Sequence, residues 1–426
     1  MKYKKYPSYK DSGVEWLGDI PENWNLLKNR HIFKTKDKVL NDKEDMTVLS
    51  LTTNGVKVKN NLSFGKSTES YVGHQMVYPG NLVFTPRDFD QTPILSGVSK
   101  YKGCISNLYL VLETNSKAYN HFVDYYWWGL KYKVNYFKNF SYGIRFSYNF
   151  EQFKEIPFLQ PPIQEQQQIV NFLDKATAKI DTLIEKQTKQ IELLKEKRQA
   201  VISHAVTKGI NPNAKMKDSG VEWLGEIPEH WEVGLLSTLF ENNSDKNKGM
   251  KNNNLLSLSY GRIINKDIET TFGLLPESFE SYQIVKPGYI ILRLTDLQND
   301  KKSLRTGLVT QEGIITSAYV GLKKKSKSIG NEKFIHYYFH TFDIYKGFYG
   351  MGSGVRQSLN FDELKKLRFV LPPKNEQQQI ANYLDEKTSK IDTLIEKSNK
   401  SIELLKEKRT ALISAAVTGK IDVRNL

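Results

Sequence analysis

Two stretches of the chain carry a long heptad pattern of apolar positions. In residues 161–210 apolar side chains recur at alternating spacings of four and three residues, and residues 372–421 repeat this pattern. An apolar stripe that continues for about four heptads is typical of a coiled coil. The predicted seam residues are Leu173, Ile180, Ile184, Ile191 and Leu194 in the first stretch, and Leu384, Ile391, Ile395, Ile402 and Leu405 in the second.

The ends of both predicted helices are marked by residues that interrupt a helix. Pro161–Pro162 and Pro372–Pro373 come before the stripes, and Gly209 and Gly419 follow them. Proline before a helix and glycine after it are the expected boundary residues. In the second stretch, Asn375 and Gln378 fit a capping box.

Arginines interrupt the predicted seam, at Arg198 and Arg409. They either extend from the edge of the seam into water or fix the register of the helices. We expect the two helices to pair with each other. The pattern leaves open whether they run parallel or antiparallel.

The chain is also an internal repeat. Lys10–Trp24 and Lys217–Trp231 are identical at 13 of 15 positions, and the two heptad stretches match at 35 of 50. Similarity at a fixed offset indicates a duplicated unit. The predicted order is a domain over 1–160, a long helix over 161–210, a second domain over 211–371, and a second long helix with the C-terminal tail over 372–426.

The two blocks between these repeats predict α+β domains. Short β-branched runs such as Asn81–Thr85 and Tyr289–Leu294 alternate with Gly and Asn turns, and an aromatic helix follows. Aromatic side chains that stack on bases are one explanation for this helix. Their helical spacing in both copies favours core packing instead; they include Tyr125, Tyr126, Trp127 and Trp128, and Phe334, Tyr337, Tyr338, Phe342 and Tyr345.

Charge and composition narrow the possible functions. The net charge is +15, and Lys and Arg exceed Asp and Glu by 7 over residues 25–160 and by 6 over 232–371. Such blocks favour a polyanionic partner. The single Cys104 excludes an intrachain disulfide and a multi-Cys zinc site. We find no secretory signal and no apolar run of membrane-spanning length, so we expect a cytoplasmic protein without a membrane partner.

Motifs of catalysis are missing from the sequence. It contains no phosphate-binding loop, no dinucleotide-binding glycine motif and no His or Cys ligands at metal spacing, so we expect neither a metal site nor catalytic residues. Candidate DNA contacts are charged residues in loops that follow matching strands or in glycine-flanked segments. A further candidate is the lysine cluster Lys323–Lys325, which is peculiar to the second copy and for which a solvated turn is the alternative explanation. Arg145 and Arg356 recur in both copies, which favours phosphate or scaffold contacts over base reading. The full set is Arg87, Asp88, Arg145, Arg293, Asp296, Lys323, Lys324, Lys325 and Arg356.

The whole chain resembles the specificity subunits of type I restriction-modification enzymes. The resemblance rests on the duplicated SGVEWLG-[DE]-IPE-x-W segments and on the duplicated helices with EQQQI, IDTLIEK and IELLKEKR. It implies two target recognition domains on an antiparallel pair of helices. Each domain would read one half of a bipartite, asymmetric DNA site.

The resemblance also implies the partners. The helices would dock two modification subunits, which use S-adenosylmethionine to methylate adenine. Restriction subunits that use ATP and Mg²⁺ would complete the complex, and this chain would hold no cofactor. A regulator or adaptor that carries two DNA-binding domains on a coiled coil remains the alternative.

Overall fold

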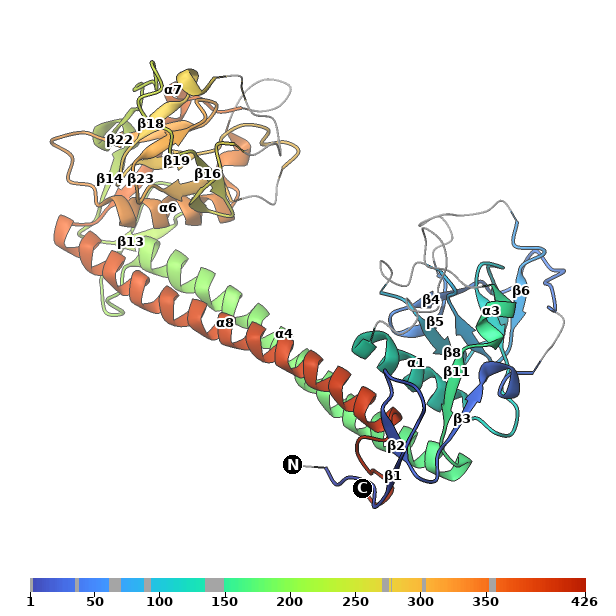
Figure 1. Ribbon diagram of the computed structural model, residues 1–426. Coiled ribbons are helices and arrows are strands. Elements are labelled where there is room, and N and C mark those ends of the chain that lie inside the picture. Colours follow the sequence, from blue (N-terminus) through green and yellow to red (C-terminus); the bar gives the residue numbers. More distant parts are fainter. Residues whose placement is uncertain are drawn as a thin grey trace. The chain divides into compact units, whose positions relative to one another are not determined.

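The computed structural model divides the chain into two compact units. Unit 1 comprises Met1–Thr188 and Asn399–Leu426, and unit 2 comprises Lys189–Ser398. Each unit therefore contains one globular domain and a part of each long helix (Figure 1). The structure describes residues 3–34, 38–60, 70–87, 93–134, 149–269, 276, 278–300, 304–351 and 358–426.

The long helices are α4, Ile163–Lys208, and α8, Lys374–Val417. They contain 46 and 44 residues. Gly209 and Gly419 follow them with positive φ angles of 78° and 71°, the left-handed conformation that ends a helix at little cost for glycine. The predicted seam residues lie buried or half-buried along both helices. The coiled-coil prediction is confirmed.

Two equivalent ion pairs show that the helices run antiparallel. In unit 1, Arg409 Nε lies 3.0 Å from Asp181 Oδ1, and in unit 2, Arg198 Nε lies 2.9 Å from Asp392 Oδ1. In unit 1 the early part of α4 therefore pairs with the late part of α8. In unit 2 the late part of α4 pairs with the early part of α8. The seam arginines form specific pairs rather than only extending into water.

The domain of unit 1 is built from short antiparallel strands and one aromatic helix, α1. Strand β3 pairs with β11, so the start of the domain closes against the strand that leads into α4. Strand β7 lies between β10 and β8 at the centre. The elements are β1 Tyr9–Asp11, β2 Asp19–Pro21, β3 Asn25–Lys28, η1 Asn29–His31, β4 Leu49–Thr52, β5 Gly55–Val58, β6 Gln75–Val77, β7 Leu82–Phe84, β8 Ser96–Val98, β9 Gly103–Ile105, β10 Leu110–Leu112, α1 Asn120–Val134, α3 Phe150–Lys154 and β11 Pro157–Gln160.

The domain of unit 2 repeats this topology. Strand β14 pairs with β23 before α8, and β19 lies between β22 and β20 in a sheet whose edge strand is β15. The elements are β12 Met216–Asp218, β13 Glu226–Pro228, β14 Glu232–Leu235, α5 Leu236–Leu239, β15 Phe240–Asn242, β16 Leu256–Ser259, β17 Arg262–Asn265, η2 Phe279–Ser281, β18 Gln283–Val285, β19 Ile290–Leu292, β20 Thr306–Leu308, β21 Gly313–Ile315, β22 Val320–Lys324, α6 Glu332–Ile344, η3 Gly347–Gly350, α7 Phe361–Leu364 and β23 Arg368–Leu371.

The aromatic helices α1 and α6 pack into the cores. Tyr126 and Trp127 in α1, and Phe334, Tyr338 and Phe342 in α6, are at most 3% exposed. The core interpretation is confirmed for these five residues. It was wrong for Tyr345, which is 60% exposed because it lies just beyond the end of α6.

Each domain contacts the end of one helix and the start of the other. In unit 1, the hairpin β1–β2 meets the end of α8, where Lys420 Nζ donates to the carbonyl oxygens of Leu17 and Asp19 at 3.1 and 2.8 Å. In unit 2, Lys208 Nζ donates to the equivalent carbonyls of Leu224 and Glu226. The near-identical hairpins are thus docking elements for the helices.

The start of each long helix is tied to its domain by one buried glutamine. Gln166 is fully buried; its Oε1 accepts from the Tyr119 backbone N at 2.8 Å, and its Nε2 donates to the Pro161 oxygen at 2.8 Å. Gln377 makes the same two contacts, with Asn331 N at 2.7 Å and the Pro372 oxygen at 2.8 Å. The first glutamine of each EQQQ segment thus joins domain and helix.

The predicted capping box at Asn375 was wrong. Helix α8 begins one residue earlier, at Lys374, so Asn375 already lies inside the first turn. Gln378 contacts other partners, because its Oε1 accepts from Asn331 and its Nε2 donates to Asn382. Capping boxes form instead at α3 and α7, through Asn149 with Gln152 and Asn360 with Glu363.

Replacing Gln166 by alanine should destabilise unit 1 by about 1–3 kcal/mol, because the partly buried Tyr119 N–H and the buried Pro161 oxygen would lose their partner. Thermal unfolding, followed by calorimetry, should show an earlier transition. Gln167→Ala is the matched control: its side chain is exposed, and its effect should stay within about 0.5 kcal/mol. Equal effects of both substitutions would contradict the assigned role of Gln166.

Candidate nucleic-acid interface

The predicted DNA contacts Arg87 and Arg293 follow equivalent central strands. Arg87 comes three residues after β7 and is exposed, and Arg293 comes directly after β19, with its side chain 32% exposed. Strand pairing supports the equivalence, since Thr85 N donates to the Leu95 oxygen and Arg293 N to the Arg305 oxygen, both at 2.8 Å. Asp88, Arg145 and Arg356 lie outside the described residues.

The segment Arg293–Asp300 forms a loop with its own internal contacts. Arg293 Nη2 lies 3.4 Å from Asp300 Oδ2. Asp296 has a φ of 56°, which is uncommon for a residue with a side chain, and its Oδ1 accepts from Asn299 Nδ2 at 2.8 Å. Asp296 therefore shapes the loop from within. Gln298 and Asn299, which sequence reasoning did not select, are exposed on it.

The predicted lysine cluster is held by its own domain. Lys323 Nζ lies 3.7 Å from Glu241 Oε1, and Lys324 Nζ lies 3.0 Å from Glu332 Oε1. Lys325 Nζ donates to the Ser237 oxygen at 2.6 Å. Each ammonium group of the cluster thus has a partner in its own domain, as Arg293 has in Asp300.

A second missed feature is the tip of the β16–β17 hairpin. Ser259 pairs with Arg262, which leaves Tyr260 and Gly261 as a two-residue turn with φ angles of 46° and 77°. Two positive φ angles indicate a type I′ turn, which favours Asn-Gly. A bulky residue is strained there. Tyr260 nevertheless occupies this strained position, and it is 89% exposed there.

The surroundings of this tip are charged. Arg262, whose side chain is 73% exposed, has Nη2 3.7 Å from Asp392 Oδ2 on α8. The tip also lies beside the segment that leads into β20, because a Cβ at Gly261 would meet Leu304 at 3.1 Å. The hairpin β4–β5 of unit 1 turns differently, through Thr53 and Asn54 with only Gly55 at positive φ. The exposed tyrosine therefore belongs to unit 2 alone.

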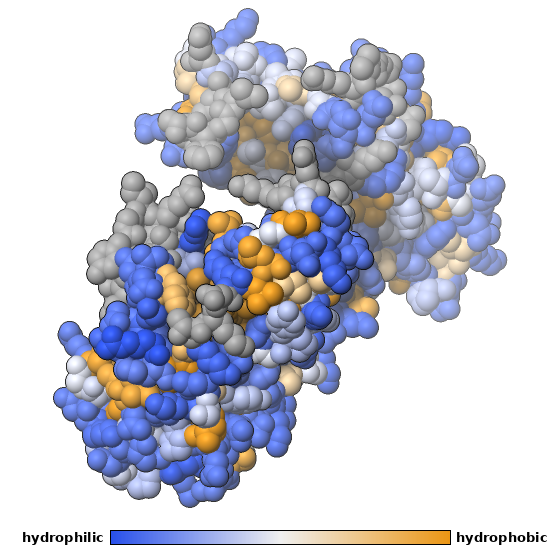
Figure 2. Space-filling view, turned by 90° about the vertical axis from the view of Figure 1, so that its right-hand side faces the viewer, coloured by the Kyte–Doolittle hydropathy of each residue, from blue (hydrophilic) through white to orange (hydrophobic). Residues whose placement is uncertain are grey.

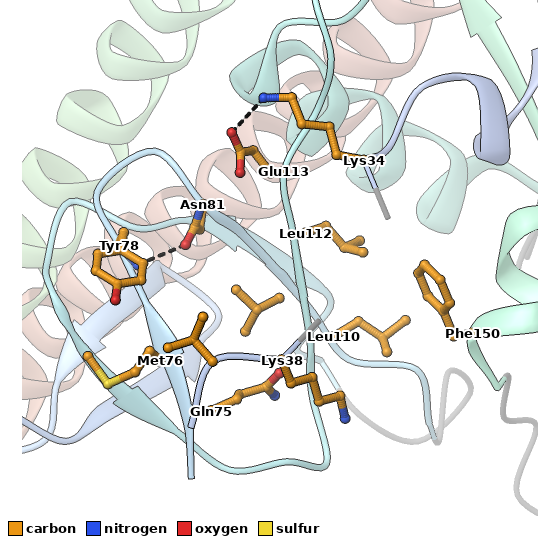
Figure 3. A pocket seen from close by; sticks show the side chains of 12 residues that line it. Lys34, Lys38, Gln75, Met76, Tyr78, Asn81, Leu110, Leu112, Glu113 and Phe150 are labelled. Carbon is orange, nitrogen blue, oxygen red and sulfur yellow. Dashed lines mark hydrogen bonds and ion pairs between the residues drawn. The ribbon is translucent and has the colours of Figure 1, made fainter. Parts of the chain in front are cut away.

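Each domain also has a pocket in an equivalent place. In unit 1 it has a volume of about 370 Å³, with an apolar side formed by Met76, Leu110, Leu112 and Phe150 and a Lys34–Glu113 ion pair at 2.7 Å (Figure 3). In unit 2 the pocket of about 360 Å³ is mostly polar. Gln75 and Gln283 line them and donate to equivalent carbonyls, those of Tyr109 and Tyr319. One scaffold thus carries two different linings.

The molecular surface gives little sign of other chemistry. The face in Figure 2 is mostly hydrophilic, with apolar patches between polar residues. Among the described residues, no three His, Cys, Asp or Glu side chains gather in a group that could hold a metal ion. Within the same part of the chain, no helix is both long and apolar enough to cross a membrane.

Comparison with known proteins identifies the family. The model of the family described as type I restriction modification DNA specificity domain matches residues 17–193 and 305–404, which is more than half of the chain. The type I restriction enzyme MjaVIII specificity subunit of Methanocaldococcus jannaschii is 27% identical over 341 residues, covering 76% of each protein.

Solved structures share the fold. A chain from work on complex assembly and conformational transition of the type I R-M system aligns with a TM-score of 0.65 at 12% identity, over 93% of this chain and 98% of that one. The HsdS subunit of Thermoanaerobacter tengcongensis aligns with a TM-score of 0.52 at 14% identity, over 94% and 98%. This chain belongs to the type I restriction-modification DNA specificity family and is a DNA sequence-specificity subunit.

Proposed function

We propose that this chain reads a bipartite DNA site, one half with each domain, and that the paired helices fix the number of unread base pairs between the halves. One observation carries the proposal: nearly identical hairpins and helices hold two domains whose exposed loops differ. A shared scaffold can place both domains in the same way, whereas different loops can read different sequences. The recognised site is therefore asymmetric.

The two domains carry different residues at equivalent places of the shared scaffold. The hairpin tip carries Tyr260 in unit 2 and Thr53–Asn54 in unit 1. The equivalent pockets differ in polarity. The positive charge of the two domains supplies the sequence-independent part of binding, through neutralised phosphates and released counterions. DNA binding by this chain is therefore strongly dependent on salt.

The helices offer equivalent apolar surfaces to a partner. The predicted seam residues face the other helix, so they do not form this surface. Leu183 and Leu404 in unit 1 are 48% and 52% exposed, and the equivalent Leu394 and Leu193 in unit 2 are 47% and 55% exposed. A shallow groove in unit 2 is lined by Leu394, Ser389, Lys390 and Thr393. We assign one modification subunit to each pair of leucines, because duplicated surfaces bind two copies of one partner.

Catalysis belongs to those partners. In this proposal the modification subunits bind S-adenosylmethionine and methylate adenine, and the restriction subunits use ATP and Mg²⁺ to translocate and cleave DNA. The chain itself contributes recognition and assembly and binds no cofactor. A DNA-binding adaptor outside restriction would instead purify without a methyltransferase.

The first test is a genome-wide map of methylated adenine in cells with and without the gene. We expect a split, asymmetric motif that disappears on deletion, because the chain alone directs the methyltransferase to its site. Methylation that persists on the same motif without the gene would refute the proposal. A continuous or palindromic motif would refute the assignment of one half-site to each domain.

Glutamate substitutions on the helices test the docking surfaces. Leu193→Glu with Leu394→Glu should remove one of two modification subunits, because a charge would be buried in an apolar interface. Leu183→Glu with Leu404→Glu should remove the other. The stoichiometry is measured by native mass spectrometry of the purified complex. Lys195→Glu, on the other flank of the seam, is the control; two bound subunits in every variant would rule these surfaces out.

Replacing Tyr260 by asparagine should stabilise unit 2 by up to about 1 kcal/mol, since asparagine suits the type I′ turn. The same change should weaken DNA binding, because the strained and exposed side chain is explained by a contact with DNA. Tyr345→Asn, which also removes an exposed tyrosine from unit 2, is the control. Gain of stability with unchanged DNA affinity would show that Tyr260 is not a DNA contact.

A further inference from the structure

Arg305 is a charged side chain with none of its surface exposed. Its guanidinium lies beneath the loop Arg293–Asp300 and donates to the carbonyl oxygens of that loop. Nη1 reaches the oxygens of Arg293 at 3.1 Å and Thr295 at 2.9 Å, and Nη2 reaches those of Asp296 at 3.4 Å and Asp300. A buried charge persists only when its donors are satisfied. Here one short loop supplies four acceptors.

The other side of Arg305 is joined to the domain core. Its Nε donates to Tyr349 Oη at 3.1 Å, and the guanidinium carbon lies 5.0 Å from the centre of the Tyr349 ring. The backbone N of Arg305 donates to Asp343 Oδ2 on α6 at 2.7 Å. The loop is therefore fastened through Arg305 to the helix and to η3, and its backbone has a defined shape.

The side chains on this loop have the chemistry of base reading. Gln298 and Asn299 are exposed, and the Arg293 side chain is 32% exposed. Amide side chains pair with adenine and guanidinium groups with guanine at the major-groove edge. A loop whose backbone is already fixed loses less freedom when it binds, so its contacts discriminate more sharply.

The arginine is particular to the second domain. Leu95 occupies the equivalent position in the first domain, where it is also fully buried. A buried leucine fills the core there without binding a loop. Arg305 is therefore no part of the common scaffold, and its effect is confined to one domain.

We propose that Arg305 is a positioning residue for DNA recognition, and that the loop Arg293–Asp300 reads base edges in the major groove of the second half-site. The inference rests on the proposed function, in which each domain reads one half. Gln298 and Asn299 are the readers, with Arg293 beside them. Arg305 touches no DNA and acts through the loop.

The experiment maps adenine methylation in cells that carry the methyltransferase partner and either the wild-type gene or a variant. Arg305→Leu introduces the residue of the first domain, Arg305→Lys keeps the charge but loses the fork of donors, and Gln298→Ala removes an exposed reader. Asn213→Ala, an exposed amide after α4, is the control. Competition binding of the purified complex to duplexes with single changes in either half-site gives the affinities.

We expect each Arg305 and Gln298 variant to keep the first half-site and to lose about tenfold or more of the discrimination at one or two base pairs of the second. Unchanged discrimination by Gln298→Ala and Arg305→Lys would overturn the proposal, and so would equal relaxation of both half-sites. Should Arg305→Leu fail to fold, Gln298→Ala decides the outcome, because its side chain is exposed. A wild-type map without a split motif would refute the proposed function itself, and the two failures are thereby distinguishable.

Discussion

The antiparallel pairing of α4 and α8 is the interaction on which the rest of the structure depends. Because the helices run in opposite directions, each unit contains the start of one helix and the end of the other. A domain can then use Gln166 or Gln377 at a helix start and Lys420 or Lys208 at a helix end. Parallel helices would not provide both contacts to either domain. The hairpin and the glutamine of each domain can contact one helix end and one helix start only because the helices pair in this direction.

The ion pairs of the seam specify this direction more than they stabilise it. Asp181 with Arg409 and Asp392 with Arg198 are partly exposed, and such pairs contribute less than about 1 kcal/mol each. In a parallel, in-register pair the two arginines, which occupy equivalent seam positions, would face each other. Like charges at the seam would penalise that alternative, which is the usual role of polar seam residues.

Sequence reasoning predicted the parts that repeat regular patterns. The heptads gave both helices, and the matched segments gave the duplicated fold, because apolar spacing reports directly on burial. The contacts that depend on tertiary structure were missed. Arg305 is one basic residue among many in the sequence, since its partners are backbone carbonyls that have no residue signature. The lysines 323–325 suggested a free basic cluster, yet each has a partner in its own domain.

The chain is symmetric in the residues that hold its helices and asymmetric in its loops. Residues shared by both copies do the first task, and residues found in only one domain do the second. Residues that fasten a helix to its domain, such as Gln166 and Gln377, occur in both copies, because the two copies perform the same structural task. Groups near the candidate DNA contacts differ in kind: Arg305 against Leu95, and Tyr260 against Thr53–Asn54. A change at an exposed loop residue such as Gln298 would then leave the helix contacts of its domain intact, since Gln377 and Lys208 make the hydrogen bonds to the helix start and the helix end. In the proposed function, recognition of each half-site is thereby separable, in physical terms, from assembly.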